Sequence, residues 1–299
     1  MLNSFVAEAP CKINLHLRIL DRREDSFHNL ESIFLALSFG DTLHFELPDG
    51  GGKGQTEVLM AGDIPPEQNL INKAVDEFRV ETGFKTPLRI RVEKRIPVGA
   101  GLGGGSSDAA AVLTGLSFLS GIIIPPDRLF EMALRLGSDV PFFLYPSAAV
   151  VSGRGDHIRR IKSPERIWVM LVNPGFPSNT GAAYGLFDQK RQPVSANRNA
   201  GDLINALYGD PARWPFRNDF LELFLEHGSK EEREGYTGIL RDLNSAGAVF
   251  TGLSGSGSTC FGIFLDKGVA EKAKKELSLR WNFVQLTFPL ARSADTVLQ

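Results

Sequence analysis

The chain has 299 residues, 42% of them hydrophobic and 23% charged, with a net charge of -2. A single core stops growing near ~250 to 300 residues, so we expect two packed domains. The nearly neutral charge argues against a general attraction for nucleic acid, and no run reaches the roughly 20 apolar residues of a membrane span. Two cysteines cannot complete a zinc site and are expected to be reduced and buried. The first residues show no secretory signal, which predicts a cytoplasmic protein.

The first half of the chain alternates between strand and helix patterns. Apolar residues at every second position from Ile13 to Ile19 predict a strand with one buried face. Glycine at 83 is expected to end the helix that precedes it. The loop expected in this half is 48–54. The expected elements here are strands over 33–37, 42–47 and 88–92 and a helix over 69–82.

The second half begins with a glycine-rich loop that leads into a helix from Ala109. We place a domain boundary between 162 and 163, because the pattern breaks there, and read the remainder as an α+β domain. The segment 189–200 is expected to be an exposed loop, and 136–141 a loop between elements. The other expected elements are helices over 127–136, 219–226, 231–243 and 269–277 and strands over 148–152, 167–172, 248–253, 260–265 and 283–288.

Five glycines lie within the seven positions 99–105, directly before the helix. Glycine lets the backbone take positive φ and approach a ligand, and the free N–H groups of a helix start attract phosphate. Gly99, Gly101 and Gly104 also match G-x-G-x-x-G, but another helix follows instead of the second parallel strand of a dinucleotide domain. The P-loop lysine is absent as well. A flexible turn with a serine cap is the remaining structural alternative.

The segment P-x-x-x-G-L-G-x-x-S-S (97–107) resembles the phosphate loop of the GHMP kinases. PCKINLHL (10–17) resembles the N-terminal motif of that superfamily, and TGLSGSGSTCFGIF (251–264) its C-terminal glycine motif. The resemblance implies an α+β, two-domain GHMP kinase fold, with an N-terminal ribosomal-protein-S5-domain-2-like domain (1–162) and a C-terminal ferredoxin-like domain (163–299). It places the active site in the interdomain cleft.

With RREDSFHNLESIF (22–34) and LGSDVPFF (136–143), the motifs are similar to those of members that act on the cytidine diphosphate conjugate of methylerythritol in non-mevalonate isoprenoid synthesis. The resemblance implies transfer of the γ-phosphoryl group of ATP, with Mg²⁺, to the free hydroxyl of the methylerythritol portion. It implies Lys12 and Asp139 as the catalytic pair, with Asp139 accepting the hydroxyl proton. Without the resemblance, Asp139 reads as a turn carboxylate and Lys12 as an ordinary strand-end lysine.

The resemblance also implies two sets of binding residues. The cytosine is expected between Phe27 and Tyr184, with His28 on its edge. The family more often has tyrosine at position 27, so a phenol hydrogen bond is lost here. The nucleotide set is Asn69, Lys94, Pro97, Gly99, Gly101, Leu102, Gly103, Gly104, Gly105, Ser106 and Ser107. The substrate set is Asn14, Phe27, His28, Thr180, Tyr184, Gly255, Ser256 and Gly257.

Other readings remain open at this point. A mevalonate or homoserine type of GHMP kinase is the nearest alternative, although a small alcohol leaves the aromatic residues nothing to stack on. A nucleic-acid-binding module and a dinucleotide oxidoreductase are alternatives from other classes. We expect a small-molecule substrate, no nucleic-acid or membrane partner, and a monomer or homodimer. The metal ligands and the order of binding are not predicted.

Overall fold

The computed structural model describes residues 3–48, 55–60, 65, 67–191 and 200–290. They fall into two compact units that the chain enters more than once. The first unit contains 1–11, 39–98 and 103–146, and the second contains 12–38, 99–102 and 147–299. Among the described residues, no helix is both long and apolar enough to cross a membrane. The predicted domain boundary between 162 and 163 stays a prediction.

Two long paired strands, β1 (Ser4–Arg22) and β2 (His28–Glu46), take part in both units. The sequence predicted two shorter strands where β2 lies, because Gly40 and Asp41 resemble a turn. This prediction was wrong. A β-carbon at Gly40 would overlap the carbonyl oxygen of Ala9 and lie 2.6 Å from the Cα of Pro10. Glycine is therefore required here for close approach of the two backbones, not for a turn.

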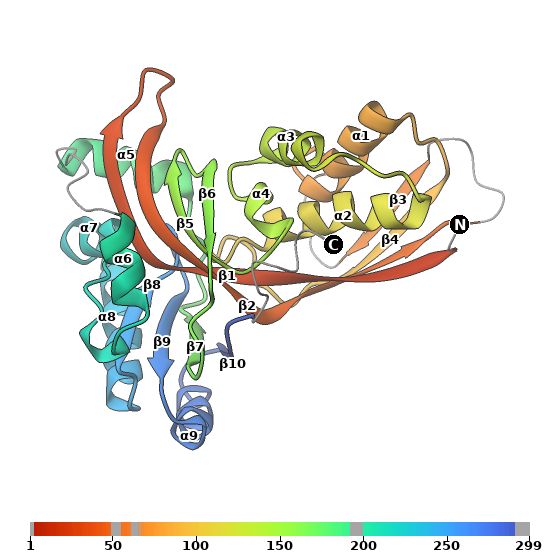
Figure 1. Ribbon diagram of the computed structural model, residues 1–299. Helices are drawn as coiled ribbons and strands as arrows, with labels where there is room; N and C mark the ends of the chain where they lie inside the picture. The colour runs from red at the N-terminus through yellow and green to blue at the C-terminus, as the bar shows by residue number, and fades with distance from the viewer. Residues whose placement is uncertain (1–2, 49–54, 61–64, 66, 192–199, 291–299) are drawn as a thin grey trace. The chain divides into compact units, whose positions relative to one another are not determined.

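In the first unit, β4 (Leu88–Glu93) lies between β3 (Thr56–Met60) and the C-terminal part of β2. Helices α1 (Leu70–Thr82), α2 (Gly104–Ser120), α3 (Pro126–Leu136) and α4 (Val140–Phe143) pack together beside these strands (Figure 1). Asn69 caps the start of α1 and Gly83, with φ of 70°, ends it, as predicted. The sequence did not predict β3, and α4 begins inside the segment read as a loop.

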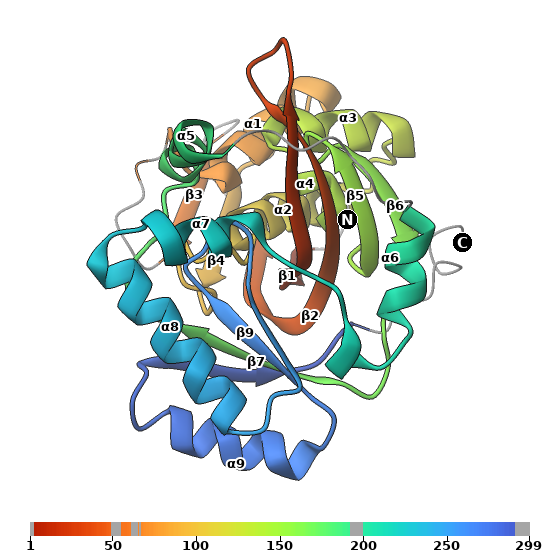
Figure 2. The same ribbon diagram turned by 90° about the vertical axis from the view of Figure 1, so that its left-hand side faces the viewer.

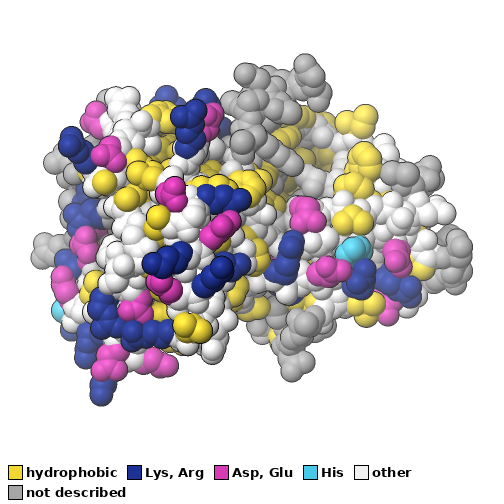
Figure 3. All heavy atoms as spheres, turned by 90° about the horizontal axis from the view of Figure 1, so that it is seen from below, with side chains coloured by type: hydrophobic (Ala, Val, Ile, Leu, Met, Phe, Trp, Pro, Cys, Tyr) yellow, Lys and Arg dark blue, Asp and Glu magenta, His cyan; other side chains and the backbone are white. Residues whose placement is uncertain are grey.

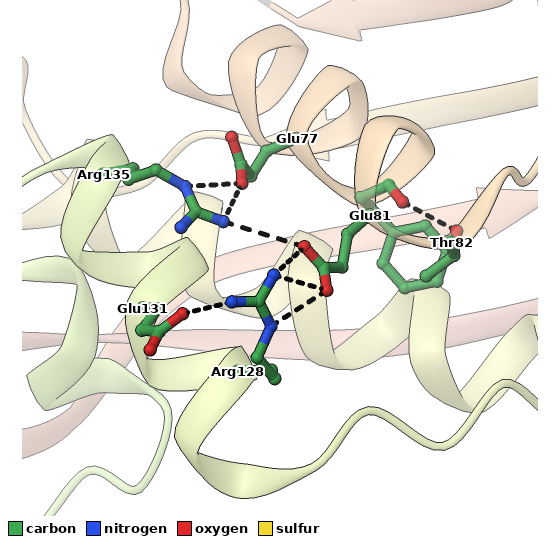
Figure 4. Close-up of polar contacts among 7 residues, drawn as sticks. Glu77, Glu81, Thr82, Arg128, Glu131 and Arg135 are labelled. Carbon is green, nitrogen blue, oxygen red and sulfur yellow. Dashed lines mark hydrogen bonds and ion pairs between the residues drawn. The ribbon is translucent and has the colours of Figure 1, made fainter.

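Ion pairs join the outer surfaces of α1 and α3 (Figure 4). Arg128 of α3 makes a two-pronged contact with Glu81 of α1, with nitrogen to oxygen distances of 2.8 to 3.1 Å. Arg135 contacts Glu77 at 2.5 Å, one helical turn away. These arginines are about half exposed, so each pair is expected to contribute only ~0 to 1 kcal/mol.

The second unit holds a four-stranded antiparallel sheet in the order β10-β7-β9-β8. Its elements are β7 (Trp168–Asn173), α8 (Lys230–Ser245), β8 (Phe250–Leu253), β9 (Cys260–Phe264), α9 (Lys267–Leu277) and β10 (Phe283–Thr287). Helices α8 and α9 contact each other and the strands, so they cover the same face (Figure 2). This βαββαβ order and the strand sequence confirm the predicted ferredoxin-like topology. Both cysteines, Cys11 and Cys260, are buried and not joined in a disulfide, as expected.

The second unit also contains the N-terminal part of β2 paired with β5 (Ala148–Gly153), which in turn pairs with β6 (His157–Ile161). Helices α5 (Thr180–Lys190), α6 (Ala200–Leu207) and α7 (Asp219–His227) complete it, with a short 3-10 turn over Pro211–Arg213. The sequence did not predict β6, α5 or α6. Residues 189 and 190 were expected in a loop but end α5. Arg191 follows α5 directly and position 200 begins α6, whereas 192–199 and most of the expected loop 48–54 lie outside the described residues.

Basic and acidic side chains are interspersed on the surface drawn in Figure 3. Many of them pair locally. On α9, for example, Lys267 and Lys272 each lie within 4 Å of a glutamate one turn further along the helix. The positive charge of these two lysines is therefore balanced locally.

Candidate functional site

Lys12 and Asn14 of β1 belong to a buried polar network in the second unit. The sequence predicted one buried face for this strand, but these two side chains are also buried, at 4% and 3% exposure. The ammonium Nζ of Lys12 donates to Oδ1 of Asn14 at 2.5 Å and lies 4.4 Å from the centre of the Phe34 ring. Nδ2 of Asn14 donates to Oγ of Ser32 at 3.0 Å, and that hydroxyl donates to the carbonyl of His16. A buried lysine with such partners is held in one orientation.

The first part of the glycine loop, 99–102, is bound to β1 and to the C-terminal glycine motif. The backbone N–H of Lys12 donates to the carbonyl of Leu102 at 3.0 Å. Oγ of Ser254 donates to the carbonyl of Gly101 at 2.8 Å and accepts from the N–H of Asn14 at 3.3 Å. The N–H of Thr259 donates to the carbonyl of Ala100. Three motifs far apart in the sequence therefore meet in the second unit.

Glycine is required where these segments meet. Gly101 has φ of 72°, and a β-carbon on it would overlap the carbonyl oxygen of Ser254 and lie 2.6 Å from that of Gly257. Gly255 and Gly257, with φ of 58° and 93°, lie on the opposite side of this contact. A β-carbon on Gly255 would lie 3.3 Å from the carbonyl oxygen of Gly101, so the two glycine segments are in close contact. Ser256 lies beside them and shares a hydrogen bond of 2.8 Å with Oγ1 of Thr180 at the start of α5.

The rest of the loop leads into α2 in the first unit. Gly103 precedes the helix with φ of 73°, and no side chain caps the first turn. Ser107, which is 1% exposed, has an Oγ without a hydrogen-bond partner among the described residues. Gly104, Gly105 and Ser106 form the same turn, and Pro97 lies in the segment before the loop. Uncapped N–H groups and an unsatisfied hydroxyl at a helix start suit a phosphate group.

A charge cluster behind this turn joins β2, the end of β4 and α2. Nζ of Lys94 lies 2.5 Å from Oδ2 of Asp41 and 2.8 Å from Oδ2 of Asp108. Burial raises the pKa of Asp108 to about 7, because the attraction of Lys94 offsets it only in part. Burial lowers the pKa of Lys94, but the charge of Asp108 and hydrogen bonds to both carboxylates outweigh it, so this pKa is raised. The predicted contact of Lys94 with the nucleotide stays a prediction, since the ammonium is bound within this cluster.

Aromatic side chains surround His28 at the beginning of β2. The imidazole stacks on Tyr184 of α5, with ring centres 5.2 Å apart and an angle of 14° between the rings, and meets Phe187 edge-on. Its Nε2 lies 2.8 Å from Oδ1 of Asp188, one turn after Tyr184 on the same helix. Phe27 is 52% exposed and lies under the guanidinium of Arg154, 5.6 Å away. The structure thus brings His28 and Tyr184 together, and the position of the cytosine between Phe27 and Tyr184 stays a prediction.

Sequence reasoning missed several residues of this site. Asp188 lies outside every motif described above, whereas Ser32 and Ser254 lie inside two of them but were not singled out. Asn218 caps α7 and also donates from Nδ2 to the carbonyls of Leu253 and Gly255, which holds the C-terminal glycine motif in place. Its position before a predicted helix was a capping signal, but the contact with the glycine motif was not readable from sequence.

The remaining predicted residues lie in the first unit. Asp139 stands at the N-terminal boundary of α4, but its side chain does not cap that helix. Lys12 belongs to the second unit, so the pairing of Lys12 with Asp139 stays a prediction. Asn69 uses Oδ1 to cap α1 and places Nδ2 3.1 Å from Sδ of Met60. Within the described part of the chain, no group of three or more His, Cys, Asp or Glu side chains is arranged to hold a metal ion by itself.

Known proteins are similar to this chain in both fold and sequence. The family model of the GHMP kinases N terminal domain matches residues 69–147, and that of the GHMP kinases C terminal matches 201–282. A 4-diphosphocytidyl-2-C-methyl-D-erythritol kinase of Thermodesulfovibrio yellowstonii is 36% identical, with 92% of this chain and 94% of that protein covered.

Two solved structures are similar over nearly the whole chain. A 4-(cytidine 5'-diphospho)-2C-methyl-D-erythritol kinase has a TM-score of 0.79 and 30% identity, and covers 97% of this chain and 100% of its own. A homoserine kinase from Cytophaga hutchinsonii has a TM-score of 0.66 at 17% identity, covering 98% of this chain and 96% of its own, which shows the fold alone. These findings identify an ATP-dependent small-molecule kinase: the chain belongs to the GHMP kinase family.

Proposed function

We propose that this kinase phosphorylates the free hydroxyl on the methylerythritol portion of 4-diphosphocytidyl-2-C-methyl-D-erythritol. The observation that carries the proposal is the stacked pair of His28 and Tyr184, with Asp188 bound to the imidazole. A planar base needs an aromatic surface and a polar group on its edge, and a small alcohol needs neither. The relatives named for this activity, similar over more than nine tenths of the chain, support the same substrate.

The chemistry needs charge neutralisation, an aligned hydroxyl and a proton acceptor. In the proposed mechanism the hydroxyl oxygen attacks the γ-phosphorus, the bond to the β,γ-bridging oxygen breaks, and ADP leaves. The carboxylate of Asp139 accepts the hydroxyl proton, and the ammonium of Lys12, oriented by Asn14, stabilises the charge on the transferred group. The loop 97–107 and the start of α2 bind the phosphates, with the Ser107 hydroxyl as a further donor.

We further propose that ATP reacts as its Mg²⁺ complex. Mg²⁺ is commonly held by substrate phosphates with one or two protein oxygens and several waters, so no dedicated cage of acidic residues is needed. This fits the described residues, which offer no such cage. The protein is proposed to act in the cytoplasm, where ATP is available.

The direct test is phosphoryl transfer from labelled ATP to a panel of alcohols. The panel contains the cytidine diphosphate conjugate, the uncytidylylated methylerythritol phosphate, mevalonate and homoserine. We expect rapid transfer to the conjugate only. Efficient phosphorylation of the truncated phosphate, mevalonate or homoserine would contradict the proposal.

A substitution in the aromatic pair supplies a second test. Tyr184→Ala should raise the Michaelis constant for the conjugate roughly 10-fold to 100-fold, since a stacked base contributes about 1 to 3 kcal/mol. The Michaelis constant for ATP should not change. An unaltered constant for the conjugate would remove Tyr184 from the base site.

A further inference from the structure

His28 is held from three directions by one face of α5. Tyr184 and Asp188 are four residues apart on this helix and therefore lie on the same side, with Phe187 beside them. The imidazole side chain is only 5% exposed. It stacks on Tyr184, meets the edge of Phe187 and contacts Asp188 through Nε2 at 2.8 Å. The ring cannot turn over without losing this hydrogen bond, so its orientation is fixed.

The partner of Nε2 decides which nitrogen carries the proton. An ionised carboxylate is only an acceptor, so Nε2 must donate its hydrogen to Asp188. In the neutral imidazole, Nδ1 is then an acceptor. Among the described residues, the side-chain hydrogen bonds of His28 all involve Nε2, which leaves Nδ1 available to a ligand.

The stacking of His28 on Tyr184 indicates where such a ligand would lie. The rings of His28 and Tyr184 are within 14° of parallel. A base that pairs with Nδ1 in the plane of the imidazole is therefore also parallel to Tyr184 and can stack on it. His28 thus already occupies the layer in which the base would be bound.

An acceptor at Nδ1 distinguishes the two pyrimidines. Cytosine presents its N4 amino group as a donor, whereas uracil presents the O4 acceptor at the same position. Two acceptors facing each other leave both unpaired, which is costly in a buried site. We propose that Asp188 is a positioning residue that keeps His28 in the Nε2–H form and thereby selects a cytosine nucleotide over a uracil nucleotide. The inference rests on the proposed function, because it assigns the base recognised at that site.

Steady-state kinetics with the cytidine conjugate and its uridine analogue test this inference. The wild type should prefer cytidine. Asp188→Asn, whose amide can donate as well as accept, and Asp188→Ala, which removes the partner, should each lower the cytidine to uridine ratio of kcat/KM roughly 10-fold to 100-fold. The Michaelis constant for ATP should stay unchanged. A ratio that is unaltered in both variants would overturn the inference.

Arg22→Gln provides the matched control. Arg22 is the exposed ion-pair partner of Asp188, and its Nη1 lies 3.7 Å from Oδ2, the carboxylate oxygen that His28 does not use. Removing this charge should leave the cytidine to uridine ratio within about twofold, because an exposed ion pair at this distance contributes little. A loss in this variant equal to that in Asp188→Asn would point to the local charge and not to the proton on Nε2.

Nitrogen-15 NMR of the imidazole separates positioning from a merely structural role. In the wild type, Nε2 of His28 should show the shift of a protonated nitrogen and Nδ1 that of an unprotonated one, whereas Asp188→Asn should show a mixture. A proton on Nδ1 in the wild type would refute the inference, whatever the kinetics. Calorimetric titration with CDP and UDP measures base preference without turnover. A wild type that binds CDP tenfold better than UDP but does not phosphorylate the conjugate would contradict the proposed function and retain this inference.

Discussion

Replacing Asp108 by asparagine is expected to stabilise the fold increasingly as the pH rises. Asp108 is 2% exposed, and its Oδ2 contacts Lys94 at 2.8 Å while its Oδ1 has no hydrogen-bond partner among the described residues. Lys94 also contacts Asp41, whose other oxygen accepts from the N–H groups of Arg95 and Ile96. One ammonium therefore serves two buried carboxylates, and Asp108 is the one with fewer partners.

The direction in which stability changes with pH follows from the pKa of Asp108. Burial raises the pKa of Asp108 from 3.8 to about 7, so between these values the folded protein binds more protons than the unfolded chain. The contribution of Asp108 to stability is then greatest below pH 3.8 and falls as the pH rises. Above about pH 7 it no longer changes with pH. The full interval corresponds to at most on the order of 4 kcal/mol, at about 1.4 kcal/mol per pH unit. Asparagine has the same shape and no proton to lose, so it should remove this dependence.

Urea unfolding of both proteins between pH 5 and 8.5 measures the effect. The advantage of Asp108→Asn should widen from pH 5 to 7 and stay constant above. Asp76→Asn is the matched control, because Asp76 is an exposed aspartate on α1 of the same unit. It should give the same difference from wild type at every pH. An advantage of Asp108→Asn that shrinks as the pH rises would show that the Lys94 attraction outweighs burial.

Three further predictions concern catalysis and the glycine loop. Asp139→Asn should lower turnover roughly 10²-fold to 10⁴-fold with an unchanged Michaelis constant for ATP, and wild-type turnover would remove Asp139 from the mechanism. Lys12→Met should lose most activity at saturating ATP, because a neutral side chain cannot stabilise phosphoryl oxygens; a normal rate would contradict this. Gly101→Ala should lower the unfolding temperature by clashing with the carbonyl of Ser254, whereas Gly105→Ala, whose β-carbon would meet Leu70 at an ordinary 3.6 Å, should not. Equal unfolding temperatures for the two variants would show that the contact at Gly101 is not tight.

Several elements could be predicted because their signals are local. The helix from 70 to 82 has its cap at Asn69 and its stop at Gly83, and the strand through Ile13 has a clear period of two. The family motifs were equally readable, since each is a short run of residue types. Gly40 was misread as part of a turn, because a glycine needed for close packing looks the same in sequence as one needed for a turn. The strand that begins at His157 was missed, because a short edge strand lacks an apolar period.

The sequence by itself determined the family, most helices and strands, and the residue types of the site. Only the tertiary structure decided which of those residues have partners. Ser32 orients Asn14 from 18 positions away, and Asp188 fixes His28 from 160 positions away. Asp108 and Asp41, which are 67 positions apart, compete for Lys94. Such pairings depend on how strands and helices pack, and the free energy of burying a polar group depends on its partner. A local sequence pattern contains neither the pairing nor this free energy, because both arise only when distant segments come into contact.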